Sequence, residues 1–523
     1  MSGDSESFDV PNGHAARRER LAKALGELRR KQEGNRRVFR SAEFSEADRT
    51  LLARMGFLQP IVRGWWMSGD PRASPGDPAI WHASLWEFCA AYCEDRFQDA
   101  WHLSPEQSLR LHAENSTIPV QVVVFSPAGA NNRLKLPFGT SLFDSRERTP
   151  VPASELVVKA GLRLFSLPSA LTRIPESFYA EAIVDAEVAL RGIRGAAEIL
   201  TPLLSGDHSV VAGRLTGAFR HIGRDDLASQ ISSTFRRAGY DFRESNPFQT
   251  PGRAGPLRGY VAPIVGRIRT LWKNSRERVI AAFPPAPGLP RDQVAYLKAV
   301  QDIYAFDAYH SLSIEGYQVT EALIEQVRTG EWNPDEHDSD RQRHNALAAR
   351  GYFLAFERAR RLVGDILNGA DPGETMRTVH LDWYQDLFEP FVIAGLLARK
   401  NLAGYRDHFV YLKTSRYVPP QKDLLPEAMS TLLDLISEEP EASVRAVLGH
   451  WLFGYIHPFP DGNGRTARLL MNAMLASGGY PWTVIRVEDR GAYLRTLDEA
   501  SLQGDIGPFA DFVAERMRWS RPV

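Results

Sequence analysis

The chain has 523 residues; 43% of them are hydrophobic, 24% are charged, and the formal net charge is −1. This length is too great for one ordinary hydrophobic core, so roughly two to four domains are expected. The balanced charge excludes a surface that is basic throughout. Any nucleic-acid binding must therefore come from a local patch.

Cysteine usage and hydropathy indicate a cytoplasmic protein. The two cysteines, Cys89 and Cys93, cannot form a disulfide framework and lack the companion ligands of a zinc site, so buried thiols are expected. No apolar run approaches the ~18–20 residues of a membrane span, and the start of the chain lacks a signal-peptide profile. We therefore expect no membrane partner. Residues 1–14 are polar and are predicted to be disordered.

Residues 15–75 are predicted to form a winged helix-turn-helix-like domain. Between residues 15 and 40, ten Lys or Arg side chains stand against three Glu. Ser45 is expected to cap a helix that ends before Gly56, and two short apolar strands with a basic turn follow within 57–67. Basic side chains here could contact DNA phosphates. A hairpin of this kind can also form a dimer surface, and a basic helix face can simply be solvated, so both alternatives stay open.

Residues 76–244 are predicted to form an α+β regulatory region. Two helices are expected within 78–112, the second capped by Ser104, and a strand is expected at 119–125. The stretch 245–256 is rich in Pro and Gly and is predicted to be a linker and the main domain boundary.

Beyond the linker, residues 257–523 are predicted to form an almost entirely helical domain. Apolar residues recur at helical spacing from 292 to 311, which predicts one long helix. Residues 411–420 differ, because they are β-like and end in a double proline, and they are predicted to form a β-hairpin flap. The fold class expected is therefore mainly α: an all-helical core with a hairpin flap, preceded by a winged-helix-like α+β region.

The most informative stretch is 457–468, which reads His-Pro-Phe-Pro-Asp-Gly-Asn-Gly-Arg-Thr-Ala-Arg and leads into a run of helix formers. The unpaired N–H groups at a helix start favour a bound anion. Glycines on both sides of Asn463 let the backbone approach a phosphate. Arg465 and Arg468 stand three residues apart, so both can reach one anion from the same helix face. The pattern predicts a polyphosphate site with His457 beside it.

This stretch matches His-x-Phe-x-Asp/Glu-Gly-Asn-Gly-Arg-x-x-Arg at every fixed position, so the chain resembles the Fic family, from about residue 290 to residue 517. The resemblance implies transfer of AMP from ATP to a Ser, Thr or Tyr hydroxyl of a target protein. Some family members transfer other phosphate-containing groups, which leaves another nucleotide or phosphate donor open.

The resemblance also implies a role for each residue. His457 is expected to be the general base, since an imidazole that titrates near about pH 6.5 is largely neutral at pH 7. Asp461 is the expected ligand of Mg²⁺, which prefers one or two carboxylates plus phosphate oxygens. The positions expected to bind nucleotide or phosphate are Asp461, Gly462, Asn463, Gly464, Arg465, Thr466, Ala467, Arg468, Tyr493 and Leu497.

Two further parts of the site follow from the resemblance. Tyr493 and Leu497 are expected to line the adenine pocket, with packing in a helix core as the alternative; Ser501 stands where the family often has Asn, which leaves contacts to the base open. The flap is expected to lie over the site and to dock the target by strand addition. Its residues here are Leu412, Lys413, Thr414 and Ser415.

Residues 311–316, Ser-Leu-Ser-Ile-Glu-Gly, match the inhibitory motif of a Fic subgroup, Ser/Thr-x-x-x-Glu-Gly/Asn. The inhibitory positions expected are Ser311, Glu315 and Gly316. A carboxylate at Glu315 that pairs with Arg468 removes the cation meant for the γ-phosphate. The alternative is a plain helix end with a Gly cap. A Glu beside Asp461 could also activate water and remove AMP again.

The N-terminal residues 1–165 resemble winged-helix regulators of the abortive-infection antitoxin type, through Leu51-Leu-Ala-Arg-Met-Gly-Phe-Leu, Arg63-Gly-Trp and Leu103 to His112. Two functions are therefore kept. The first is a self-inhibited, Mg·ATP-dependent protein adenylyltransferase. The second is a DNA-binding regulator of a toxin–antitoxin type whose enzymatic half is secondary, and a fusion would satisfy both.

Overall fold

The computed structural model describes residues 12–74, 76–206, 208–241, 243–248, 260–332, 340–413 and 415–520, without the side chains of 12–17 and 340–342. The chain packs as two compact units. The first comprises Met1–Leu109, Thr117–Ile174 and Tyr411–Val418, and the second Arg110–Ser116, Pro175–Val410 and Pro419–Val523. Most of the predicted disordered start and most of the predicted linker lie outside the described residues.

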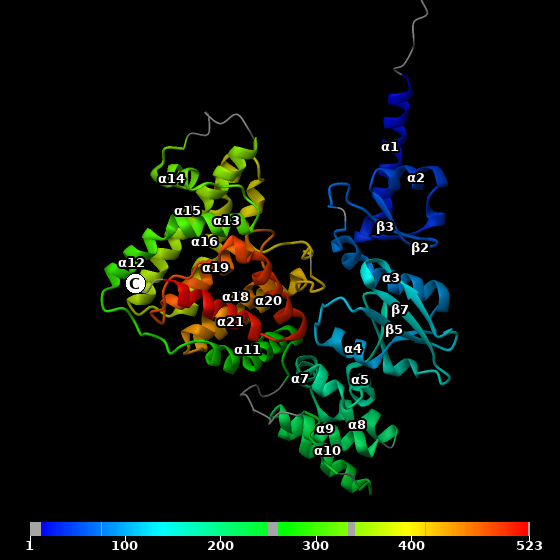
Figure 1. The fold of residues 1–523 in the computed structure, drawn as a ribbon. Coiled ribbons are helices and arrows are strands. Elements are labelled where there is room, and N and C mark those ends of the chain that lie inside the picture. Colours follow the sequence, from blue (N-terminus) through cyan, green and yellow to red (C-terminus); the bar gives the residue numbers. More distant parts are fainter. Residues whose placement is uncertain are drawn as a thin grey trace, which may run out of the picture. The chain divides into compact units, whose positions relative to one another are not determined.

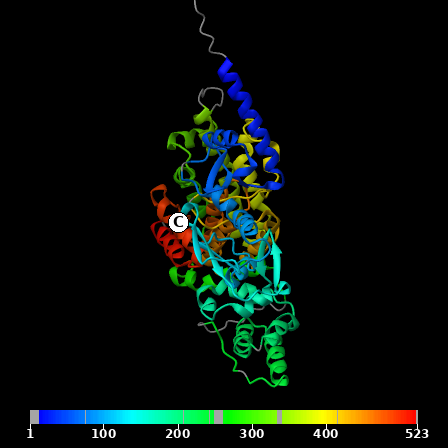
Figure 2. The ribbon, with the colours of Figure 1, turned by 90° about the vertical axis from the view of Figure 1, so that its right-hand side faces the viewer.

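The first unit begins with two helices and a small sheet, in the order α1 (Asn12–Lys31), β1 (Val38–Arg40), α2 (Glu46–Arg54), β2 (Leu58–Val62) and β3 (Trp65–Ser68). The sheet is antiparallel with the order β1-β3-β2, and α1 is the long blue helix of Figure 2. The hydroxyl of Ser45 accepts a hydrogen bond from the N–H of Asp48 and caps α2 as predicted. Leu28, Phe39 and Leu52 form the core of this part. The predicted helix and hairpin are confirmed, whereas the winged-helix assignment stays a prediction.

The remainder of the first unit is built around a four-stranded sheet. Its strand order is β4-β5-β7-β6, in which β5 and β7 run parallel and the other neighbours are antiparallel. The strands β8 and β9 form a separate hairpin. Cys89 and Cys93 are buried, free thiols on α3, as predicted. The elements are α3 (Ala79–Phe97), β4 (His102–Leu103), α4 (Pro105–His112), β5 (Gln121–Ser126), β6 (Asn132–Lys135), β7 (Ser141–Arg146), β8 (Leu156–Lys159), β9 (Leu162–Phe165) and α5 (Leu167–Arg173).

The predicted β-hairpin at 411–420 is wrong, because the described residues of this stretch contain no strand. Instead, its backbone hydrogen bonds are made elsewhere in the first unit. The N–H of Ile118 donates to the carbonyl of Arg416 over 2.8 Å, and the Arg416 guanidinium donates to the carbonyl of Ile118 over 3.1 Å. Pro419 and Pro420 have no N–H to complete a ladder. Tertiary contacts have therefore overridden the local β pattern.

The second unit begins with helices that precede the linker: α6 (Phe178–Glu181), α7 (Ile183–Arg191), α8 (Ala196–Ser205), α9 (Ser209–His221) and α10 (Asp225–Arg237). The helices α8, α9 and α10 lie side by side, and α7 packs on α11 (Pro263–Ala282) (Figure 1). Residues 175–248 thus pack with the helical part of the chain that follows them. The predicted boundary at 245–256 stays a prediction.

The helices α18 (Ala442–Ile456) and α19 (Asn463–Ala476) pack against each other at the centre of the second unit (Figure 1). Nearly all their residues are buried, including the polar residues Arg465 and Arg468 of α19. The surrounding helices are α12 (Gln293–Asp302), α13 (Tyr304–Ile314), α14 (Glu321–Thr329), α15 (Asp340–Leu367), α16 (Pro372–Ile393), α17 (Leu425–Glu438), α20 (Arg490–Gln503) and α21 (Gly507–Trp519).

The single helix predicted over 292–311 is wrong, because the chain forms α12 and α13 with a break at Ile303. The apolar face continues across the break, since Val300 and Tyr304 are both buried. Hydrophobic periodicity therefore could not reveal the break at Ile303. Among the described helices, none has the length and apolar character that crossing a membrane requires.

Candidate functional site

The junction between α18 and α19 places His457 at the end of a helix in a left-handed conformation, with φ 51° and ψ 58°. Residues other than glycine adopt such angles at a cost that the surrounding structure must offset. Its Nδ1 lies 3.3 Å from the carbonyl oxygen of Gly454. A carbonyl only accepts, so Nδ1 carries the proton and Nε2 keeps a free lone pair. Burial lowers the pKa of His457 to about 4, which keeps the imidazole neutral at pH 7.

The loop is held by the side chain of Asn463. Its Oδ1 accepts from the N–H of Phe459 over 3.0 Å, and its Nδ2 donates to the carbonyl of the same residue over 2.8 Å. The Phe459 ring stacks on Tyr384 with the centroids 4.4 Å apart. Gly462 has φ 79°, and a Cβ there would lie 2.9 Å from the Phe388 ring. The Asn463 side chain thus fixes the loop. Because this side chain is engaged, Asn463 can contact an anion only through its backbone N–H.

Arg406 is a functional candidate that the sequence did not reveal. It is buried, and its Nε donates to the carbonyl of His457 over 2.8 Å while its N–H donates to the carbonyl of Pro458 over 2.8 Å. Its Nη1 and Nη2 donate to the carbonyls of His408 and Pro420, over 2.9 and 2.5 Å. One guanidinium therefore connects the backbone of His457 to His408 and Pro420, which lie on either side of residues 411–418. No spacing or motif marks such a residue in the sequence.

The N-terminus of α19 has no side-chain cap, which suits a bound anion. Gly462 is the N-cap residue, and no side chain among the described residues accepts from the first N–H groups of the helix. A Cβ at Gly464 would lie 2.4 Å from Oε1 of Glu315, so a larger residue there would displace the Glu315 carboxylate. The hydroxyl of Thr466 donates to the carbonyl of Gly462 over 3.0 Å, and Ala467 is buried. The predicted loop residues are thus gathered around one helix start.

Arg468 is occupied by the predicted inhibitory residues. Its Nε donates to Oγ of Ser311 over 2.9 Å, and its Nη2 donates to the Ser311 carbonyl over 3.0 Å and to Oε1 of Glu315 over 2.7 Å. Gly316, with φ 92°, ends the helix that presents both residues. Burial alone would raise the pKa of Glu315, but the charges of Arg468 and Arg465 outweigh it and hold that pKa below its ordinary value. The carboxylate is therefore ionised at pH 7.

Arg465 is in the opposite situation. Its side chain is 0% exposed, and its three guanidinium nitrogens have no hydrogen-bond acceptor among the residues that the structure describes. The nearest carboxylate, that of Asp461, lies 3.7 Å away. The guanidinium lies over the rings of Tyr317 and Phe388, at 5.3 and 5.2 Å from their centroids. Its hydrogen-bond donors are thus unused within the described site.

A magnesium ion fits the donor set at Asp461. The carboxylate is 65% exposed, and its Oδ1 accepts only the neighbouring N–H of Gly462, over 2.6 Å. The described residues contain no cluster of three His, Cys, Asp or Glu that could hold a metal by themselves. A single carboxylate that completes its shell with phosphate oxygens and water suits Mg²⁺.

Tyr493 and Leu497 lie on α20, beside the buried end of α18. The Tyr493 hydroxyl lies 2.8 Å from Nε2 of His450, and its ring is buried. Ser501 donates to the Leu497 carbonyl over 2.8 Å and accepts from Trp451 over 3.1 Å. The position where the family often has Asn is therefore used to attach α20 to α18. A role of Tyr493 and Leu497 toward adenine stays a prediction.

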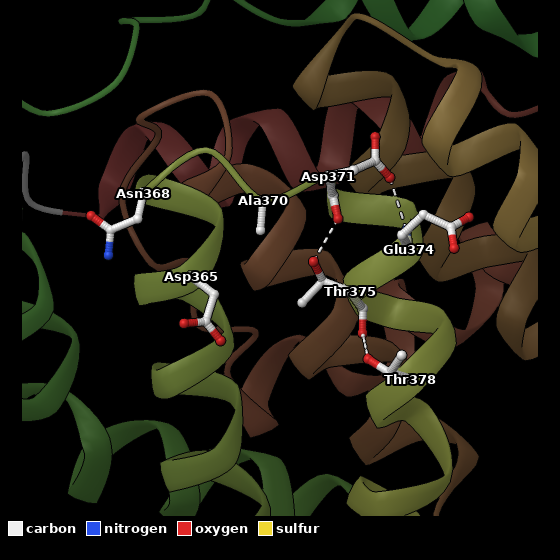
Figure 3. A pocket seen from close by; sticks show the side chains of 7 residues that line it. All are labelled: Asp365, Asn368, Ala370, Asp371, Glu374, Thr375 and Thr378. Atoms are coloured by element: carbon white, nitrogen blue, oxygen red, sulfur yellow. Dashed lines mark hydrogen bonds between the residues drawn. The ribbon is translucent and has the colours of Figure 1, made fainter.

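The predicted flap residues Leu412, Lys413 and Ser415 belong to the first unit, and Thr414 lies outside the described residues. Their role over the active site stays a prediction. A hollow of about 560 Å³ lies elsewhere, between the end of α15 and the start of α16 (Figure 3). Its carboxylates include Asp371, which caps α16 by accepting from the N–H of Glu374. Asp371 therefore has a structural role at the start of α16.

Comparison with known proteins finds a family match for part of the chain. Residues 373–475 match the Fic/DOC family, so the chain contains a Fic domain. A protein adenylyltransferase Fic of Nematostella vectensis is 32% identical over 231 residues, which are 43% of this chain and 50% of that protein. Protein adenylyltransferase fic-1 of Caenorhabditis elegans is 36% identical over 104 residues, 19% of this chain and 20% of that one. The chain thus spans half or less of the length of these relatives.

Solved structures similar to this chain also contain Fic domains. A Fic domain-containing signaling protein from Bacteroides thetaiotaomicron has a TM-score of 0.32 at 19% identity, covering 49% of this chain and 93% of that one. Fic-1 of C. elegans, residues 134–508, has a TM-score of 0.34 at 17% identity, covering 68% of this chain and 96% of that one.

Proposed function

We propose that this protein transfers AMP from Mg·ATP to a hydroxyl side chain of a target protein, and that Glu315 keeps it inactive at rest. The observation that carries the proposal is a neutral, half-buried histidine beside an uncapped helix start with two arginines. Relatives named protein adenylyltransferase support the same reaction. The protein target, ATP as the donor and Mg²⁺ as the metal are all part of this proposal.

The reaction follows from the groups present. Nε2 of His457 takes the proton of the target hydroxyl, and the oxygen forms a bond to the α-phosphorus of ATP. The bond between the α-phosphorus and the bridging oxygen breaks, and pyrophosphate leaves. The N–H groups at the start of α19 and the guanidinium of Arg465 stabilise the negative charge on the phosphates. Mg²⁺ at Asp461 would neutralise charge on the same oxygens.

The contacts of Arg468 support the proposed inhibition. Arg468 donates to Ser311 and Glu315 and is therefore not available to the γ-phosphate. ATP bound without this cation would have its α-phosphate out of line with the incoming hydroxyl. Loss of the Glu315 carboxylate frees the guanidinium.

The test uses the full chain with labelled ATP and a cell lysate as the source of targets. Glu315→Gly is expected to raise label transfer at least about tenfold, because a charge-assisted contact to Arg468 is lost. His457→Ala on that background should abolish transfer while ATP still binds. UTP and GTP, labelled in the α-phosphate, compare the donors. Full transfer by the double variant, or no transfer by Glu315→Gly with any donor, would overturn the proposal.

A second activity is favoured by the same carboxylate. Oε1 of Glu315 lies where it would touch a Cβ at Gly464, directly at the start of α19. A carboxylate in this place could activate water and release AMP from a modified target. A target that the Glu315→Gly variant has labelled should then lose its label on incubation with the chain that keeps Glu315. Label that stays in place would contradict the idea.

A further inference from the structure

Arg465 carries a buried charge that the protein itself does not neutralise by hydrogen bonds. Its side chain is 0% exposed, and the carboxylate of Asp461 is 3.7 Å away. A buried ion without good partners is costly, so such a group is retained for a ligand or is held by other means. Arg465 is the third residue of α19, and the uncapped start of this helix is suited to phosphates.

Two aromatic rings hold this guanidinium. Its central carbon lies 5.3 Å from the ring centroid of Tyr317 and 5.2 Å from that of Phe388. A cation over a ring face is attracted by the π system, while the N–H groups at the guanidinium edge stay available for hydrogen bonds. The two rings therefore support the guanidinium, whose nitrogens have no hydrogen-bond acceptor among the described residues.

Tyr317 is fixed in its place by its own surroundings. Its N–H donates to the carbonyl of Leu312 over 3.1 Å, and the next N–H, that of Gln318, donates to Oδ1 of Asn345 over 3.2 Å. Its ring stacks on His344, with the centroids 5.7 Å apart. The ring is thus a rigid support. Burial raises the pKa of the Tyr317 hydroxyl, so the ring meets Arg465 as a neutral phenol.

We propose that Tyr317 is a positioning residue for the nucleotide: its ring holds the Arg465 guanidinium with the donor edge toward the phosphates of ATP. The inference rests on the proposed function. Tyr317 stands only two residues after Glu315, so one turn of chain carries two opposed contacts. Glu315 binds Arg468 and so keeps it from the nucleotide, whereas Tyr317 positions Arg465 to bind the nucleotide. The inhibitory segment is therefore also part of the phosphate site.

The experiment compares Tyr317→Leu with Tyr317→Phe in the full chain that carries Glu315→Gly. Phe keeps the ring face and removes only the hydroxyl, whereas Leu fills much of the space without a π system. Binding of Mg·ATP and of inorganic tripolyphosphate is measured by calorimetry with His457→Ala added, so that no turnover occurs. KM for ATP and kcat are measured without that change. Tyr317→Met is a second apolar replacement in case the Leu variant folds poorly, which thermal unfolding shows.

Tyr317→Leu is expected to weaken both ligands and to raise KM about tenfold, while kcat changes less and Tyr317→Phe stays within about twofold of the parent. Binding by the Leu or Met variant as tight as that of the parent overturns the inference, as does an equal loss in the Phe variant. If the Glu315→Gly parent transfers AMP and the Tyr317 substitutions change nothing, the inference fails but the proposed function stands. Phosphate binding that depends on Tyr317, in a parent that transfers nothing, leaves the inference standing and removes the proposed function.

Discussion

At the scale of single residues, burial decides the protonation state of the site. An exposed histidine titrates near neutral pH, but the pKa of His457 is lowered to about 4, chiefly by burial, with Arg406 acting in the same direction. The imidazole, our proposed base, is therefore neutral at any pH near 7. The sequence predicted a histidine base, but it gave no indication of so large a shift of its pKa.

The pH dependence of transfer tests this shift. For the Glu315→Gly variant, kcat/KM should stay level from about pH 8 to about pH 5.5, because the neutral imidazole declines only near its lowered pKa of about 4. The same burial makes the fold less stable as pH falls below the ordinary histidine pKa of about 6.5 and on toward 4, since the unfolded chain takes up the proton first. Circular dichroism at each pH is therefore the control. A half-loss of rate near pH 6.5 in a folded sample would contradict the assignment.

The hydroxyl of Ser311 offers a graded test of the inhibitory contact. Ser311→Ala removes the acceptor of one hydrogen bond from Arg468 but leaves the Glu315 carboxylate in place. Transfer should rise, but less than in Glu315→Gly, because the charged partner is the stronger one. Initial rates of label transfer for the two variants and their combination decide this. A Ser311→Ala variant as active as Glu315→Gly would contradict the ranking.

At the scale of elements, the site depends on how helices end. The helix α18 ends at a left-handed His457, α19 starts at an uncapped Gly462, and α13 ends before Gly316. The start of α19 leaves backbone N–H groups available to an anion, and the end of α13 places the Glu315 carboxylate against Arg468. Arg406 then ties the backbone of the loop to the segment on either side of 411–418. The geometry of the loop is therefore set by a residue far from it in sequence.

Arg406→Lys should disturb the loop without removing the charge. A lysine cannot reproduce the fork that donates to several carbonyls, so buried acceptors lose their partners. Transfer by the Glu315→Gly chain should fall about tenfold or more, and the free energy of unfolding should fall by about 1–3 kcal/mol. Arg399→Lys, at an exposed position, is the matched control and should change neither. An Arg406→Lys chain with unchanged transfer would show that the ties are dispensable.

At the scale of the whole molecule, the chain joins a Fic domain to a first unit of different architecture. Binding of DNA and formation of a dimer by the first unit stay predictions. A hollow of about 500 Å³ between α1 and α2 is lined by Arg20 and Arg54, which are the kind of side chains that contact phosphates. The segment 411–418 joins this unit by packing, although it is covalently part of the helical half.

DNA binding is tested by retention of the full chain on duplex DNA at several salt concentrations. If α1 and α2 contact the backbone, affinity should fall steeply with salt, and Arg54→Gln should reduce the slope by about one. Arg399→Gln serves as the control for loss of one exposed charge. The absence of retention at low salt would leave the first unit without a DNA role.

The sequence by itself predicted the proposed chemistry: the motif 457–468 with its histidine and two arginines, and the upstream Glu315, could all be recognised because each depends only on neighbouring residues. Helices with clear caps, such as α2 behind Ser45, were predicted for the same reason. Only the tertiary structure decided the break at Ile303, the loss of the predicted hairpin at 411–420, and the positions of Arg406 and Tyr317. These features depend on packing and on hydrogen bonds between distant residues, which a local pattern does not contain.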